Sequence, residues 1–220
     1  MVSDPRYRRN FLRGPPPRDP AFLTEQATGI DGPVEMWPVL GDLRFSYLLA
    51  WGNANRGSSL TALGQAPEGL TFITEGLSTL RATGAVLLMP WILTKLAETH
   101  RQLGRPGEGL NRLAEAAQII EATDEQREEA ELHRVRGDLL NATGDQAAAE
   151  QSYHQSLAVA QRQSAKLFEL RAATSLARLW RDQGKRIEAR ALLAPVYGWF
   201  TEGLDTPVLQ DAKALLDQLT

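Results

Sequence analysis

The chain has 220 residues, of which 43% are hydrophobic and 23% are charged, so it can bury a substantial core. Its net charge of −3 excludes the broad basic surface that nucleic-acid binding requires, and the absence of cysteine excludes disulfides, thiolate nucleophiles and Cys-type zinc sites. The longest apolar stretches fall short of the roughly 18 residues that span a bilayer, and the first residues lack the apolar segment of a secretory signal. We therefore expect a cytoplasmic protein that binds neither nucleic acid nor membrane.

The first 44 residues differ from the rest of the chain. Proline and arginine are concentrated there, and none of the periodic pattern described below extends into them. Such a segment has few apolar side chains to bury, so we expect residues 1–44 to form a poorly ordered arm with a partial helix around residues 20–27.

A 40-residue repeat fills the remainder of the chain. The phrase LGQAPEGL at residues 63–70 returns as LGRPGEGL at residues 103–110. The same shift superimposes Gly64, Gly104, Gly144 and Gly184. Small residues stand seven positions before and five positions after these glycines, among them Ala97, Gly137, Ala177, Ala149 and Ala189. Columns that keep their character in every copy indicate a repeated structural unit, which we place at residues 45–84, 85–124, 125–164 and 165–204.

Each unit has the pattern of a helical hairpin. Apolar residues recur with helical spacing before and after the glycine, which suits the left-handed conformation that ends a helix. Pro67 and Pro106 fit the first turn of the second helix, and Asp145 fits its N-cap. At one unit boundary, Thr123 and Gln126 fit a capping box. The small residues allow the two helices of a hairpin to approach closely.

A last helix is expected at residues 206–219. Thr206 fits its N-cap and Pro207 its first helical position, while one face is apolar and the other is charged. A polar outer face is what the end of a helical solenoid requires. The sequence therefore predicts an all-α, right-handed superhelix of about four long hairpins closed by a capping helix.

The columns resemble those of the tetratricopeptide (TPR) repeat. Besides the small residues and the turn glycine, a large side chain stands nine positions after the glycine, as at Ile73 and Tyr153. The usual tetratricopeptide unit has about 34 residues, and HEAT and armadillo units of about 40 are closer in length. The residue types in the columns nevertheless favour the tetratricopeptide interpretation. This resemblance implies a non-catalytic module for protein–protein interaction.

A second resemblance is more specific. RATGA at residues 81–85, EAELHRVRGDLL at residues 129–140 and the long stretch from ELRAATSLARLW at residue 169 to residue 219 resemble the C-terminal repeats of bacterial adenylate/guanylate cyclases with an attached predicted ATPase. The chain departs from those proteins because it carries neither the cyclase domain nor a G-x-x-x-x-G-K-[ST] phosphate loop. The resemblance implies a scaffold or regulatory part in bacterial signalling that acts on cyclase or ATPase domains in trans.

The tetratricopeptide resemblance also indicates a binding surface. In such proteins, side chains of the first helix of each hairpin line the hollow of the superhelix. The matching positions here are Trp91, Thr94, Glu98, Arg101, Arg134, Asp138, Asn141, Arg171, Arg178 and Arg181. A guanidinium can bind a carboxylate with two parallel hydrogen bonds, so an acidic peptide or a peptide C-terminus is the expected ligand. Neighbouring acidic residues could instead neutralise these arginines locally.

No motif in the sequence indicates catalysis. There is no G-x-S-x-G nucleophile elbow, and His100, His133 and His154 lack neighbours at metal-ligand spacing. We therefore expect no enzyme activity, no metal and no cofactor. Self-association through the exposed edge of the first repeat, as in a homodimer, is an alternative to the binding of a different protein.

Overall fold

The computed structural model describes residues 36–220 and divides the chain into two compact units, Met1–Asp42 and Leu43–Thr220. The helices of the described residues are α2 (Met36–Ala62), α3 (Ala66–Ala82), α4 (Met89–Gln102), α5 (Pro106–Thr123), α6 (Glu129–Ala142), α7 (Gln146–Arg162), α8 (Lys166–Asp182), α9 (Arg186–Tyr197) and α10 (Pro207–Gln218). Helix α2 thus begins before residue 45, where the first repeat is expected to start. The arm and partial helix expected further upstream fall on residues 1–35, outside the described residues.

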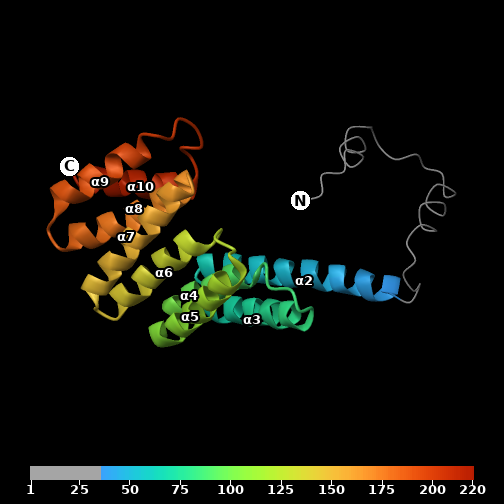
Figure 1. The fold of residues 1–220 in the computed structure, drawn as a ribbon. Helices are drawn as coiled ribbons and strands as arrows, with labels where there is room; N and C mark the ends of the chain where they lie inside the picture. The colour runs from blue at the N-terminus through green and yellow to red at the C-terminus, as the bar shows by residue number, and fades with distance from the viewer. Residues whose placement is uncertain (1–35) are drawn as a thin grey trace, which may run out of the picture. The chain divides into compact units, whose positions relative to one another are not determined.

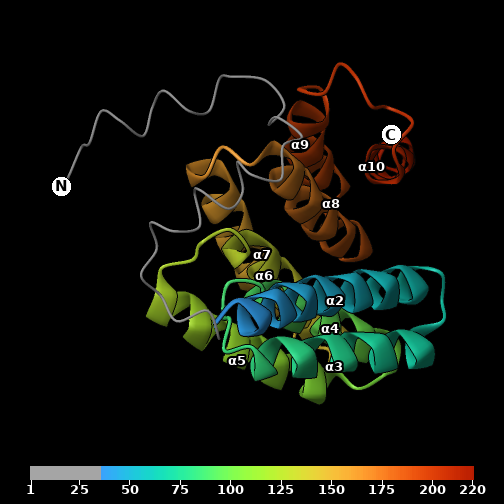
Figure 2. The same ribbon diagram turned by 90° about the vertical axis from the view of Figure 1, so that its right-hand side faces the viewer.

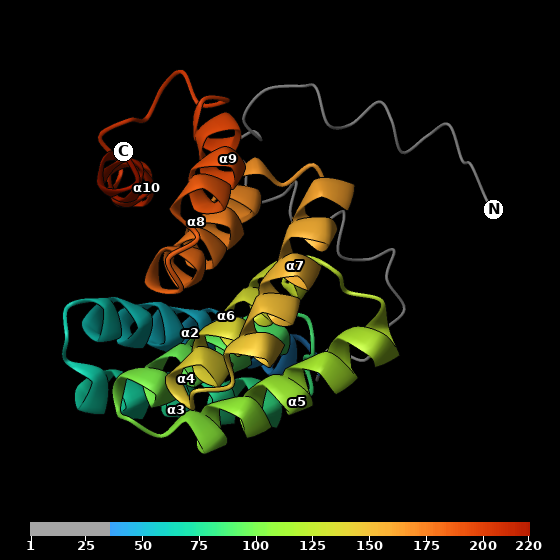
Figure 3. The same ribbon diagram turned by 90° about the vertical axis from the view of Figure 1, so that its left-hand side faces the viewer.

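Consecutive helices pair as hairpins, and successive hairpins pack side by side (Figure 1). The pairs are α2 with α3, α4 with α5, α6 with α7 and α8 with α9, after which α10 packs on α8 and α9. Two further views show α8, α9 and α10 grouped at the end of the repeat unit opposite α2 and α3 (Figures 2 and 3). This arrangement confirms the predicted fold class, an all-α solenoid of helical hairpins.

The turn inside each hairpin is built on a glycine. Gly64, Gly104, Gly144 and Gly184 have φ values of 81°, 69°, 88° and 82°, a left-handed conformation that other residues adopt only with strain. Each glycine amide donates to a carbonyl three residues earlier, as Gly104 does to Arg101. Because the glycine reverses the chain within three residues, the second helix returns along the first.

The caps follow the sequence only in part. Asp145 caps α7 by accepting a hydrogen bond from the amide of Ala148. The expected capping box at Thr123 was wrong, because α5 continues through Thr123, whose hydroxyl donates to the carbonyl of Ile119, and Asp124 takes the left-handed conformation after it. Thr206 stands at the N-cap of α10, but its hydroxyl donates back to the carbonyl of Gly203 and makes no cap hydrogen bond.

The small columns lie where helices cross. Ala97, Ala177, Ala149 and Ala189 are fully buried. A Cβ atom placed on Gly137 would lie 2.4 Å from the ring of Tyr153, so the glycine makes room for the tyrosine. The apolar core consists mainly of one cluster from α2 to α6 and a second from α7 to α10. None of the described helices is long and apolar enough to cross a bilayer.

Replacing Gly69 with alanine should lower the free energy of unfolding by about 1–3 kcal/mol, because the added methyl group overpacks the contact between α2 and α3. A Cβ at Gly69 would lie 2.3 Å from the Thr61 hydroxyl and 2.6 Å from the Gly57 carbonyl oxygen, and the backbone atom cannot move away cheaply. Urea denaturation measures the change. Gly107→Ala is the matched control: nothing lies within 4 Å of its Cβ position, so it should be neutral or stabilising. Equal stability of the two variants would show that the close approach is dispensable.

Candidate binding site

Helices α4, α6, α8 and α10 contact one another in that order, each α-helix being the first of its hairpin or, for α10, the closing helix. We call the surface that they form the inner face. The second helices α3, α5, α7 and α9 lie on the other side of the hairpins, which we call the outer face. The inner face is where the tetratricopeptide resemblance places the partner-binding residues.

A buried ion network occupies the middle of the inner face. Arg134 on α6 forms a fork with Glu131, in which Nε lies 3.0 Å from Oε2 and Nη2 lies 2.7 Å from Oε1. Its Nη1 donates to Asp138 at 2.6 Å, and its Nη2 donates to Glu98 of α4 at 2.5 Å. Only 7% of Arg134 is exposed, and 2% of Glu131. Arg134 therefore holds three carboxylates together and ties α4 to α6.

Further side chains complete the network. Arg171 on α8 places Nη2 2.8 Å from Glu131 Oε1 and 3.7 Å from Glu98 Oε1. Lys95 donates to Glu98 Oε2 at 2.9 Å, and the Tyr153 hydroxyl donates to Asp138 Oδ1 at 2.8 Å. Each carboxylate thus has at least two partners, and the network spans three successive hairpins through α4, α6 and α8.

The charges of this network favour one another's ionised forms. Burial opposes ionisation of Glu98, but Lys95 and Arg134 outweigh it, so the pKa of Glu98 lies at about 2. Burial opposes the charge of Glu131 as well, and Arg134 nevertheless holds the pKa of Glu131 below its usual value. The same carboxylates overcome the burial of Arg134 and raise the pKa of its guanidinium. The network is therefore ionised throughout the physiological range.

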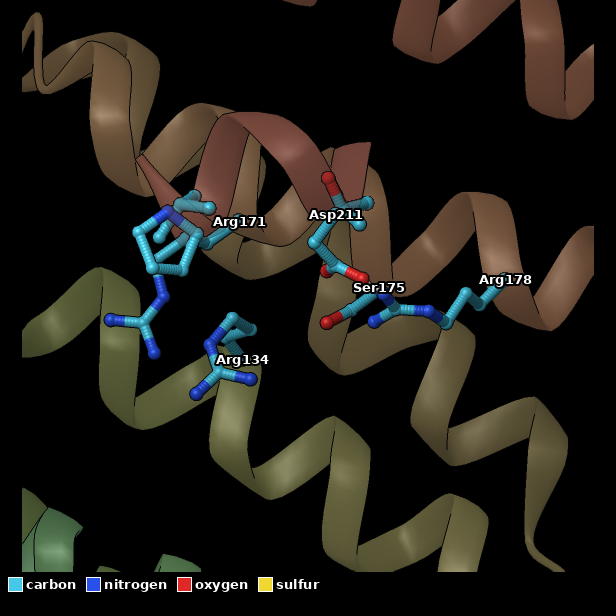
Figure 4. A pocket seen from close by; sticks show the side chains of 8 residues that line it. Arg134, Arg171, Ser175, Arg178 and Asp211 are labelled. Atoms are coloured by element: carbon cyan, nitrogen blue, oxygen red, sulfur yellow. Dashed lines mark hydrogen bonds and ion pairs between the residues drawn. The ribbon is translucent and has the colours of Figure 1, made fainter. Parts of the chain in front are cut away.

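A cavity of about 360 Å³ opens next to the network, between α6, α8 and α10. It is lined by Arg134, Arg171, Thr174, Ser175, Arg178, Pro207, Val208 and Asp211. Figure 4 shows the guanidinium groups of Arg134 and Arg171 side by side at one end, with Arg178 and Asp211 facing each other at the other. Arg178 and Asp211 form an ion pair in which 41% and 53% of the side chains are exposed. Three arginines against one aspartate leave the lining positive.

The structure distributes the expected partner-binding residues over several environments. Glu98, Arg134, Asp138 and Arg171 join the network, and Arg178 reaches the cavity. Arg181 pairs with Asp182 and donates to Gln218. Arg101 and Asn141 are exposed outside the cavity, Trp91 is half-buried against the core, and Thr94 is fully buried with its hydroxyl donating to the Pro90 carbonyl. Only part of the expected set therefore meets in one place.

Sequence reasoning missed the contribution of α10 and of Lys95. Pro207, Val208 and Asp211 come from the closing helix, which was expected only to shield the end of the solenoid. The signal was available: a further 40-residue shift from Arg171 leads to Asp211, so the closing helix continues the same column as Trp91 and Glu131. Among the described residues, no group of three or more His, Asp or Glu side chains could hold a metal ion.

Comparison with known proteins agrees with this geometry. Residues 88–162 match the family model of the tetratricopeptide repeat. Two crystal structures of a Podosopora anserina protein, identified as a kinesin light chain with nearly identical TPR-like repeats, are similar with a TM-score of 0.58 and 17% identity over 79% of this chain and 85% and 86% of theirs. The crystal structure of BtubC (BKLC) from P. vanneervenii is similar with a TM-score of 0.54 and 15% identity over 86% of this chain and 90% of that chain. At these identities the likeness shows the fold alone.

No curated protein matches the chain in sequence. Neither the family match nor the similar structures relate it to the cyclase–ATPase proteins. What the comparisons support is the tetratricopeptide resemblance, at the level of the repeat and of the fold. The chain is thus a tetratricopeptide repeat protein, with the repeat matched at residues 88–162 and a TPR-like arrangement of hairpins around it.

Proposed function

We propose that the chain is a non-catalytic module that binds an acidic segment of a partner protein on its inner face. Tetratricopeptide domains are in general protein–protein interaction modules. The observation that carries the proposal is the positive cavity between α6, α8 and α10, in which three guanidiniums face one carboxylate. A carboxylate from a side chain or from a peptide C-terminus is the group that such a lining recognises.

The arginines of the cavity have different roles in this proposal. Arg134 is buried and holds three carboxylates already, so it supports the floor of the site. Arg171 and Arg178 expose 28% and 41% of their side chains, which leaves donors free to turn toward a ligand. An incoming carboxylate would compete with Asp211 for Arg178 and would gain from Arg171 at the same time.

The remaining lining suits a short peptide segment. Val208 and Pro207 offer apolar surface beside the arginines, and the Ser175 hydroxyl lies within the same cavity. Arg101, Asn141 and Arg181 lie outside the cavity and would contact only a segment that runs on along the inner face. No observation in the structure favours cyclase or ATPase domains as the partner.

The double variant Arg171→Gln with Arg178→Gln tests this proposal. The probe is a library of random decapeptides displayed with free C-termini, selected on the immobilised protein. We expect the unaltered protein to enrich acidic peptides and the double variant to bind the enriched peptides at least about tenfold more weakly, because charge-assisted hydrogen bonds are lost. Kd values from fluorescence anisotropy measure the difference.

Arg127→Gln serves as the matched control, since Arg127 is an exposed arginine away from the cavity with 70% of its side chain accessible. It should bind the selected peptides as the unaltered protein does, and all variants should keep their helical circular dichroism. Enrichment without acidic residues, or binding that the double variant retains in full, would contradict the proposal.

A further inference from the structure

A second cavity, of about 310 Å³, lies on the outer face between α3, α4 and α5. Its lining consists of Leu70, Thr74, Leu77, Ser78, Arg81, Leu96, His100, Arg105, Glu108 and Arg112. The leucines give it an apolar wall, while three guanidiniums, one imidazole and one carboxylate give it a polar one. It is separate from the inner-face cavity, which is lined by α6, α8 and α10.

The cations of the outer cavity exceed the acids that accompany them. Arg81 and Arg112 share a single carboxylate, that of Glu115, to which Arg112 lies 3.5 Å distant. Within the described residues, Arg105 makes no ion pair at the positions recorded for the other arginines, and it stands exposed at the N-cap of α5. Glu108 is the only acid in the lining. The cavity is therefore positive in an acidic protein.

Two buried nitrogen atoms at this cavity lack hydrogen-bond partners among the described residues. They are His100 Nδ1 and Arg112 Nε. Only 4% of His100 is exposed, and its Nδ1 lies 3.3 Å from Glu108 Oε2 without the geometry of a hydrogen bond. A buried polar group without a partner is costly, so each is a place where a ligand oxygen would gain more than it would on an exposed surface.

The repeat shows that packing does not require these charges. A shift of 40 residues carries Arg81, His100, Arg105 and Arg112 onto Glu121, Leu140, Asp145 and Ser152. The corresponding groove of the next hairpin is lined by Leu110, Leu113, Ala114, Ala117, Leu132, Arg136 and Leu140, which are nearly all apolar. The hairpins thus create a groove at each step, and the sequence makes one of them cationic.

We propose that the outer cavity binds a small organic anion, whose phosphate or carboxylate group lies among Arg105, Arg112 and His100 and whose apolar part lies against Leu70, Leu77 and Leu96. Its volume is at the lower end of the range for small-molecule sites, about 300–1,000 Å³. Guanidiniums supply the charge-assisted hydrogen bonds, and the leucines bury the apolar part. This site is independent of peptide binding on the inner face.

Phenyl phosphate, phenylacetate, inorganic phosphate and phenol are the probes that test it. The readout is the ring-proton NMR signal of His100, which is one of only three histidines in the chain. Burial lowers the pKa of His100, Glu108 opposes this effect, and Arg112 and Arg105 add to it. A bound anion stabilises the imidazolium, so phenyl phosphate or phenylacetate should shift the signal saturably and raise the pKa of His100, while the exposed His154 should not respond.

The comparison of probes and variants decides the outcome. We expect inorganic phosphate to bind about tenfold or more weakly than phenyl phosphate, and phenol to produce no shift, because the site needs both the charge and the apolar group. Arg105→Gln, at an exposed position that should not disturb folding, and Arg112→Gln should each raise the Kd about tenfold. Arg178→Gln on the inner face should leave it unchanged. No saturable shift with either organic anion, equal binding of phenol, or a Kd unaffected by both substitutions would overturn the proposal.

Discussion

Replacing Arg134 with methionine should lower the free energy of unfolding by about 3–5 kcal/mol, because it leaves buried carboxylates without their main counter-charge. Glu131 would keep Arg171, and Glu98 would keep Lys95, but the fork that ties α4 to α6 would be gone. Urea denaturation followed by circular dichroism at pH 7 measures the loss. The helical content below the transition should stay near that of the unaltered protein, since the core clusters are intact.

Two controls separate this effect from loss of packing. Adding Glu131→Met to Arg134→Met removes the most deeply buried acid together with its partner and should recover part of the stability, because a matched apolar pair avoids the desolvation of both ions. The difference between Arg134→Met and the unaltered protein should also shrink as the pH falls toward 4, where the deprived carboxylates bind protons in the variant. A variant as stable as the unaltered protein at pH 7 would show that the network contributes nothing.

Replacing Glu128 with glutamine should have the opposite effect and stabilise the fold by about 2 kcal/mol at pH 8. Glu128 stands at the N-cap of α6 with 8% exposure. Burial raises its pKa from 4.5 to about 7, the negative charges of Glu131 and Glu125 add to this effect, and Lys95 and Arg127 oppose it. The ionised carboxylate therefore disfavours the folded state, and the neutral amide removes that cost.

The sign of the pH dependence follows from the direction of the shift. Glu128 binds its proton more tightly in the folded state, so its contribution to stability is fully present below pH 4.5 and is lost as the pH rises to about 7. Glu98 has a lowered pKa, and its contribution is present above pH 4.5 and lost as the pH falls toward 2. Unfolding curves at pH 5, 6, 7 and 8 should thus show the gain from Glu128→Gln growing with pH.

Glu121→Gln is the matched control for this series. Glu121 is exposed near the end of α5, and its replacement should change the stability by less than about 0.5 kcal/mol at every pH. A gain from Glu128→Gln that stays constant across the series would show that the lost charge is not the cause. A loss of stability at pH 8 would show that the ionised carboxylate makes a favourable contact in the folded protein.

The hairpins were accessible from the sequence because their determinants are local. A glycine that must adopt positive φ, such as Gly104 or Gly184, marks a turn whatever surrounds it. Helical spacing of apolar residues on either side then gives the helices. The capping box at Thr123 failed for a reason of the same range: a threonine hydroxyl can also bond to its own helix, as it does to Ile119, so the helix runs one turn further than the motif indicates.

The binding site was accessible only in outline. The repeat register places Glu98, Arg134 and Arg171 on first helices, and they do meet across three hairpins. The register could not show that Arg134 is already held by three carboxylates and buried. That depends on how closely α4 and α6 pack, since charges a few ångströms apart interact strongly and charges further apart do not. The outer cavity escaped notice because the resemblance directs attention to first helices, although its arginines break the pattern of the repeat.

By itself, the sequence determined the periodicity, the turns and the all-α architecture, because backbone conformation at glycine and the spacing of apolar side chains act within a few residues of one another. The tertiary structure alone decided which charges are spent on holding the hairpins together and which line a cavity. Arg134 and Arg178 occupy equivalent kinds of position on their helices, yet one is buried among acids and the other is partly exposed beside Asp211. The physical reason is that ion pairing and burial are set by side chains from different hairpins, whose distances exist only once the solenoid has formed.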